Sequence, residues 1–199
     1  MKPSLTDMLC TQCGLCCDGS LFADVELAGQ AEATRLEIMG LEIDDDAEGE
    51  LLLLPCAALD GTRCGIYAHR PKCCRSFECH LLQGARRGAV TVERATEQIA
   101  EARKRIGTVK DLLAQLGQSD VRLSLKERCA EALSGKPSAI PGVNRRRTEL
   151  ETAMSAVERL IRKTFLGVGG EGGARSPKGS GVPSRDRKAG PRSPLSETR

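Results

Sequence analysis

The chain has 199 residues and a net charge of +3; 40% of its residues are hydrophobic and 29% are charged. The sequence contains three Phe, one Tyr and no Trp, so its core must consist mainly of aliphatic side chains. A small core of this kind usually needs disulfides or a metal to stabilise it. The excess of basic residues lies in the C-terminal tail, and few aromatic side chains are present to stack on bases, so nucleic-acid binding is not expected.

Neither an export signal nor a membrane span is evident in the sequence. The N-terminal segment lacks the apolar stretch of a secretory signal, and the longest apolar run, residues 51–59, is too short for a bilayer and contains Pro55. We therefore expect a cytoplasmic protein without membrane contact. In a reducing compartment, closely spaced cysteines are typical of metal ligands or redox groups, and an exported disulfide scaffold is the alternative.

Composition divides the chain into three regions. Residues 1–85 carry nine of the ten cysteines and are predicted to form a small α+β metal-binding domain with short strands. Residues 90–166 are predicted to form a helical extension. Residues 167–199 are rich in Gly, Ser and Pro and are predicted to form a disordered basic tail, because they cannot bury enough apolar surface to offset their chain entropy.

The elements expected in the first region are short. In chain order they are a strand and turn within 22–29, a helix over 29–40 that ends at Gly40, a buried strand over 50–55, a turn at Asp60 and Gly61 leading into a second short strand, and a helix from Pro71 through residue 82.

In the second region, apolar residues recur at alternating spacings of four and three, which is the pattern of a helix face. The first stripe consists of Ala95, Ile99, Ala102, Ile106, Val109, Leu113 and Leu116. Ser124 and Glu127 form a capping-box pattern that predicts the start of a second helix. A third helix is expected from about Asn144, with an apolar face formed by Leu150, Met154, Val157, Leu160 and Ile161. We expect these faces to pack within the chain; a dimeric coiled coil is the alternative.

The cysteines fall into two runs, "CTQCGLCC" at residues 10–17 and "CGIYAHRPKCCRSFEC" at residues 64–79, with Cys56 between them. Repeated C-x2-C spacing indicates thiolate metal ligands, which select zinc, copper(I) or iron–sulfur. Adjacent side chains diverge in both helices and strands, so Cys16 and Cys17 cannot readily bind one ion, and the same holds for Cys73 and Cys74. The spacing therefore indicates two metal sites, or one cluster with additional thiols.

The identity of the metal is left open by the spacing. The run C-x2-C-x2-C lacks the continuation of a bacterial ferredoxin, and neither His69 nor His80 has zinc-finger spacing. An all-sulfur site is compatible with either zinc or iron–sulfur. Arg70 and Arg75 are expected to lie beside the sulfurs, and the two histidines to lie at the surface or beside the ligands.

The two cysteine runs and "LPCAAL" together resemble the CxxCxxCC-type zinc- or iron-chelating proteins, that is, the YkgJ-type cysteine-cluster proteins, which are related to the cysteine module of flagellin lysine N-methylases. The resemblance covers about residues 8–82. It implies that the metal ligands are Cys10, Cys13, Cys16, Cys17, Cys56, Cys64, Cys74 and Cys79. Cys73 stands where the family pattern allows any residue. Cys129 lies outside the motif and is expected to be a half-buried thiol on a helix.

This resemblance implies a protein that binds an iron–sulfur cluster, or zinc as the alternative, and that acts in electron transfer or as an iron–sulfur oxidoreductase. A second interpretation is a zinc-stabilised interaction module, or an accessory to a protein-modifying enzyme. In either case we expect a protein partner to dock on the helical extension. The sequence contains no dinucleotide or methyl-donor fingerprint.

Overall fold

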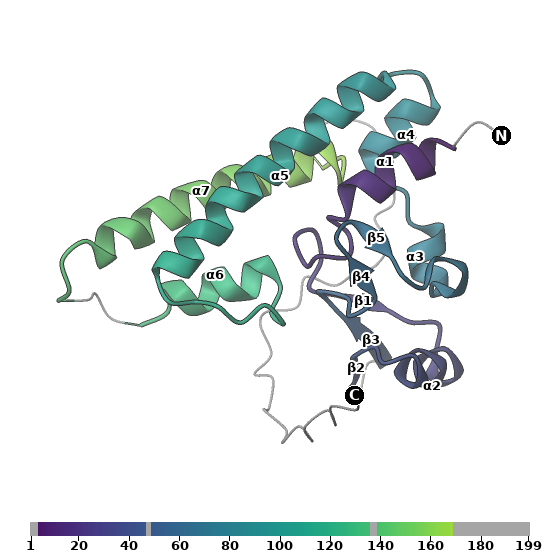
Figure 1. Ribbon diagram of the computed structural model, residues 1–199, viewed down its shortest axis with the longest axis horizontal. Helices are drawn as coiled ribbons and strands as arrows, with labels where there is room; N and C mark the ends of the chain where they lie inside the picture. Colours follow the sequence, from purple (N-terminus) through teal and green to yellow (C-terminus); the bar gives the residue numbers. More distant parts are fainter. Residues whose placement is uncertain (1–3, 47–48, 136–138, 169–199) are drawn as a thin grey trace, which may run out of the picture.

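The computed structural model describes residues 4–46, 49–135 and 139–168 (Figure 1). It is a mixed α+β structure in which a small sheet lies beside a longer helical part, as the sequence predicts. The elements, in chain order, are α1 (Leu5–Cys13), β1 (Asp24–Glu26), α2 (Gln30–Ile38), β2 (Ile43–Asp46), β3 (Gly49–Leu53), β4 (Leu59–Asp60), β5 (Arg63–Cys64), a 3-10 turn (Tyr67–His69), α3 (Lys72–Ser76), α4 (His80–Arg86), α5 (Val92–Gln115), α6 (Leu125–Leu133) and α7 (Val143–Thr164). The predicted tail lies outside the described residues from residue 169 onward.

The main sheet is antiparallel, with β3 between β1 and β2. Leu52 of β3 pairs with Val25 of β1 and with Ile43 of β2, and its side chain is buried. A small core forms beneath α2; its buried members are Leu27, Ala33, Leu36, Leu41 and Leu52. We call this cluster the sheet core. The expected strands at residues 22–29 and 50–55 and the helix at residues 29–40 are thereby confirmed.

The helical part is built on α5, which lies lengthwise against α7 (Figure 1). The stripe predicted on α5 is buried from Ala95 to Leu113, and on α7 Leu150, Met154, Val157 and Ile161 are buried. Ser124 begins α6 with the expected capping box, in which its hydroxyl accepts from the Glu127 N–H at 3.3 Å. The three predicted helices and their packing within the chain are thereby confirmed. No helix in the described ranges is long and apolar enough to cross a membrane.

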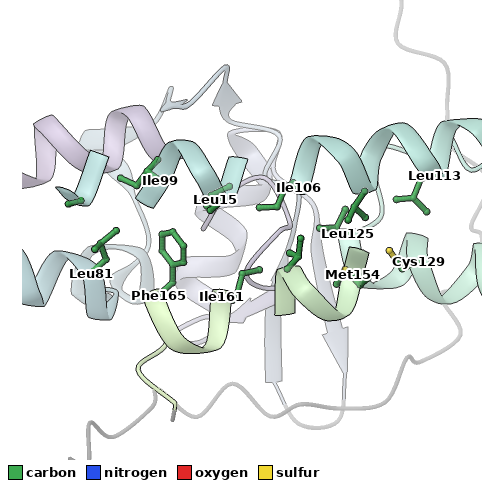
Figure 2. Close-up of a cluster of buried hydrophobic side chains, with 14 of the residues drawn as sticks. Leu15, Leu81, Ile99, Ile106, Leu113, Leu125, Cys129, Met154, Ile161 and Phe165 are labelled. Carbon is green, nitrogen blue, oxygen red and sulfur yellow. The ribbon is translucent and has the colours of Figure 1, made fainter. Parts of the chain in front are cut away.

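One hydrophobic cluster, here called the helical core, joins these helices to the N-terminal region. Leu9 and Leu15 enter it from α1 and the turn that follows, and Leu81 enters it from α4. Figure 2 shows Phe165 directed from the end of α7 toward α5, on which Ile99 lies. The helical core thus spans the boundary predicted near residue 85, and the division into a cysteine domain and a helical extension stays a prediction.

The prediction of a single helix from Pro71 through residue 82 is wrong, because the chain forms two helices there. Pro71 is the N-cap of α3 rather than its first residue, and Phe77 ends α3 in an extended conformation. The rings of Phe77 and Phe22 meet edge to face, with centroids 5.2 Å apart. Cys79 then caps α4, and its Sγ accepts a hydrogen bond from the Leu82 N–H at 3.4 Å. The break therefore gives Cys79 a position separate from that of Cys73 and Cys74.

Candidate metal centre

The first two motif cysteines lie in a helix, although the spacing gave no expectation of one. Ser4 caps α1, with its hydroxyl accepting from the Asp7 N–H at 3.1 Å, and the Asp7 carboxylate accepts from the Ser4 N–H in return. Cys10 and Cys13 are three residues apart in α1 and therefore lie on one face of it. The capping-box pattern at Ser4 was the sequence signal that could have identified this helix.

Gly14 ends α1 and turns the chain into the second half of the motif. Its φ is +70°, and a Cβ there would lie 3.1 Å from the Thr62 Cα, so both the turn and the close approach require glycine. Thr62 in turn donates a hydrogen bond to the Thr11 carbonyl oxygen at 2.5 Å. The β4–β5 connection is thereby fixed against α1, and the following turn holds Cys16 and Cys17.

Four thiols come together where α1 meets α4. Cys10, Cys13 and Cys79 all pack against the helical core. Burial raises the pKa of Cys16 well above its usual range, and the next contributions come from the neighbouring Cys13 and Cys79 thiols. We call this set the α1 group; its members are Cys10, Cys13, Cys16 and Cys79.

A second set of four thiols surrounds the β4–β5 hairpin. The Cys56 N–H donates to the Cys17 carbonyl oxygen at 2.8 Å, and the Cys56 carbonyl oxygen accepts from the Leu59 N–H at 3.0 Å. Leu59 is the strand partner of Cys64, so the hairpin holds Cys64 near Cys56. The short helix α3 adds Cys74, since Cys17 and Cys56 are among the neighbours that raise its pKa, after Cys73 and burial. We call this set the hairpin group; its members are Cys17, Cys56, Cys64 and Cys74.

The pKa values of the thiols follow from burial and from these neighbours. Burial raises the pKa of Cys10 to about 11 and that of Cys13 to about 12, with Cys79 adding to both. Burial also raises the pKa of Cys17 to about 12, and there the next causes are Cys56 and Cys64. Cys10, Cys13 and Cys17 are therefore protonated near pH 7, and a metal that binds them must displace these protons.

Cys73 and Cys129 are the two cysteines outside the motif. The Sγ atoms of Cys73 and Cys74 lie 4.0 Å apart, and Cys73 packs against the sheet core. Hydrogen bonding with Cys73 and then burial raise the pKa of Cys74. Cys129 lies on α6, as expected. The expectation that it is half-buried is wrong, because it faces the helical core and is only 4% exposed. Figure 2 shows it beside Met154.

The basic side chains near the thiols come partly from distant parts of the sequence. The guanidinium carbon of Arg70 lies over the Tyr67 ring, 3.7 Å from its centroid. The positive charge of Arg70 lowers the pKa values of Cys10 and Cys17, but burial, which raises them, has the larger effect. Arg103 of α5 donates to the Cys13 carbonyl oxygen at 2.8 Å. Arg75 is exposed, and its expected position beside the sulfurs stays a prediction. Nothing in the local sequence around Arg103 identifies its contact, which depends on the packing of α5.

The two histidines are exposed. The His80 N–H donates to the Phe165 carbonyl oxygen at 2.8 Å, and its ring lies against Gly167. His69 is exposed, and its carbonyl oxygen accepts from Arg35 at 3.0 Å. Their exposure agrees with the expected position at the surface, and the ligand set stays a prediction.

The donor chemistry of both thiol groups fits a thiophilic metal. Each group offers four sulfur donors, which is the set taken by tetrahedral zinc or by an iron–sulfur cluster. In the part of the chain that the structure describes, no three His, Cys, Asp or Glu side chains stand close enough together to share an ion as placed. Binding of one ion by all four thiols of either group would therefore require their side chains to move.

Comparison with known proteins identifies the family of the cysteine region. Residues 9–106 match the CxxCxxCC family, described as "Putative zinc- or iron-chelating domain". The matched range includes all eight motif cysteines and ends within α5, the helix whose Arg103 contacts the Cys13 carbonyl. No curated protein and no solved structure matches the chain. Through residues 9–106, the chain belongs to the CxxCxxCC family of zinc- or iron-chelating domains.

Proposed function

We propose that this cysteine domain binds iron–sulfur through its eight motif cysteines and acts in electron transfer, as part of an oxidoreductase system. The observation that carries the proposal is the donor set: two groups of four cysteine thiols, whereas both histidines are exposed and lack zinc-finger spacing. All-cysteine ligation is the usual environment of iron–sulfur clusters.

The position of the thiols also suits electron transfer. All eight motif cysteines are half-buried, so they lie near the surface without being open to it. Cys64 lines a shallow pocket beside Arg63 and Tyr67, and Tyr67 is itself exposed. A redox partner could approach a centre at this depth. We place the docking of a protein partner on the helical extension, residues 90–166, whose outer faces carry many charged side chains.

A zinc-stabilised interaction module is the second candidate, and the number of thiols favours it. Each group has the four ligands of one tetrahedral zinc, and structural zinc sites are usually closed in this way. Zinc would stabilise the fold without redox chemistry, and the protein would then act through its surfaces, for instance as an accessory to a protein-modifying enzyme.

Purification of the full chain under anaerobic, iron-replete conditions distinguishes the two candidates. Iron–sulfur predicts brown protein that contains iron and acid-labile sulfide and that bleaches with dithionite. The matched control is the chain with Cys10, Cys13, Cys17 and Cys74 changed to Ser, expressed in the same way, which should be colourless. Colourless wild-type protein with stoichiometric zinc and no sulfide would overturn the electron-transfer proposal and support the interaction module.

A further inference from the structure

We propose that the eight motif cysteines form two separate four-cysteine metal sites, one in the α1 group and one in the hairpin group, and that each site can be filled without the other. This inference rests on the proposed metal binding by these cysteines, but not on whether the metal is iron or zinc. The ligand class for each site is a thiophilic metal ion or cluster held by four thiolates.

The backbone separates the two groups at a single peptide bond. Cys16 and Cys17 are adjacent, and adjacent side chains point in different directions. The Cys17 carbonyl oxygen is held by the Cys56 N–H at 2.8 Å, which ties Cys17 to the hairpin side. Cys13 is fixed on the other side, in α1, where its carbonyl oxygen accepts from Arg103 at 2.8 Å. The motif thus contributes three thiols to one group and one to the other.

The second cysteine run is divided in the same way by the break between α3 and α4. Cys74 lies in α3, whereas Cys79 caps α4 and its Sγ accepts from the Leu82 N–H at 3.4 Å. Since α4 packs against α1, Cys79 joins the α1 group. Cys74 lies in α3, before the break, and its Sγ is 4.0 Å from that of Cys73, which packs against the sheet core together with Cys56.

The two groups also face different hydrophobic cores. In the α1 group, Cys10, Cys13 and Cys79 pack against the helical core. On the hairpin side, Cys56 and its neighbour Cys73 pack against the sheet core. Each site would therefore stabilise one core, and the small sheet core depends more on its metal because it has fewer buried residues.

Cadmium NMR on the full reduced chain, loaded with cadmium alone, tests this division. Two resonances are expected, one from each site. Cys79→Ser should remove one resonance and Cys64→Ser the other, with the cadmium content of each variant falling to about half. Serine at position 79 can still cap α4, so this variant should fold. Cys73→Ser is the matched control and should keep both resonances.

The outcomes separate this inference from the proposed function. A single resonance in the wild-type chain, or loss of all cadmium in either variant, would overturn the two-site division while leaving metal binding intact. A wild-type chain that binds no cadmium, zinc or iron would contradict metal binding itself. If a variant is poorly folded, native mass spectrometry of the wild-type chain decides the matter: a dominant species with a single metal centre overturns the division, and stepwise filling of two supports it.

Discussion

The backbone N–H of Cys56 donates a 2.8 Å hydrogen bond to the carbonyl oxygen of Cys17, and this bond joins the N-terminal cysteine motif to the segment that follows β3. It holds two candidate ligands together by the main chain, without any contribution from their side chains. In the folded chain, the main chains of these two members of the hairpin group are therefore held side by side.

Metal removal is expected to unfold the cysteine region first. The sheet core is small, and without metal the four thiols of the hairpin group contribute no bonds between its segments. A chelator should therefore abolish the dispersed NMR signals of residues 22–76, while α5 and α7 keep part of the helical circular dichroism. Unchanged spectra after complete metal removal would contradict this coupling.

The non-motif cysteines should not affect metal content, but Cys129 should affect stability. Cys129 is buried in the helical core, so the hydroxyl of Cys129→Ser would lose hydrogen bonds to water, at a cost of about 1–3 kcal/mol in free energy of unfolding. Denaturant unfolding measures this loss, and metal analysis should show wild-type content. Cys13→Ser is the contrasting variant, which should lose metal. Equal metal loss in both variants would make the ligand assignment wrong.

The pH dependence of stability should include a contribution from Cys129 above pH 9. Burial raises its pKa from 9.0 to about 11 in the folded chain. The unfolded chain therefore ionises this thiol first, and stability that is fully present below pH 9 is lost as the pH rises toward 11, by at most roughly 2–3 kcal/mol. Denaturant midpoints of the wild type and of Cys129→Ala, compared at pH 8 and pH 10.5, isolate this contribution. A constant difference between the two proteins would contradict it.

Gly14→Ala should weaken the metal centre, and Gly88→Ala provides a matched control. Both glycines have a φ of +70°, so both substitutions should cost about 1–2 kcal/mol of backbone strain. Only at Gly14 would the added Cβ approach another backbone, at 3.1 Å from the Thr62 Cα, whereas nothing lies within 4 Å of the Cβ at Gly88. We expect Gly14→Ala to be the less stable variant and to lose metal affinity in a competition assay. Equal behaviour of the two variants would contradict a role for this close approach.

Regular patterns made the helical part predictable from the sequence. The stripe on α5 and the capping box at Ser124 are local signals, and the structure confirms both. The strand β2 was not predicted, because its sequence is mostly acidic and has one hydrophobic residue, Ile43, which packs against the sheet core. The break at Phe77 was missed because it depends on a ring contact with Phe22, which lies far away in the sequence.

The candidate ligands could be identified from the sequence, but their grouping could not. Spacing alone showed that Cys16 and Cys17 diverge and left open whether they served two sites or one. The position of Cys79 beside α1 depends on the packing of α4 against α1, and that of Cys64 on the hairpin pairing with Leu59. These are tertiary relationships, and no local pattern encodes them.

The two residues between Cys13 and Cys16 show that the motif is more than its cysteines. Gly14 allows the turn at the end of α1, and Leu15, only 1% exposed, anchors that turn in the helical core. An attempt to transplant the motif into an unrelated scaffold would therefore have to carry over this Gly–Leu pair and provide an apolar cavity to receive the leucine. Thiols grafted at the same spacing without that anchor would lie on a flexible loop. Each time a metal bound, the loop would lose conformational entropy, and the metal affinity would be lower.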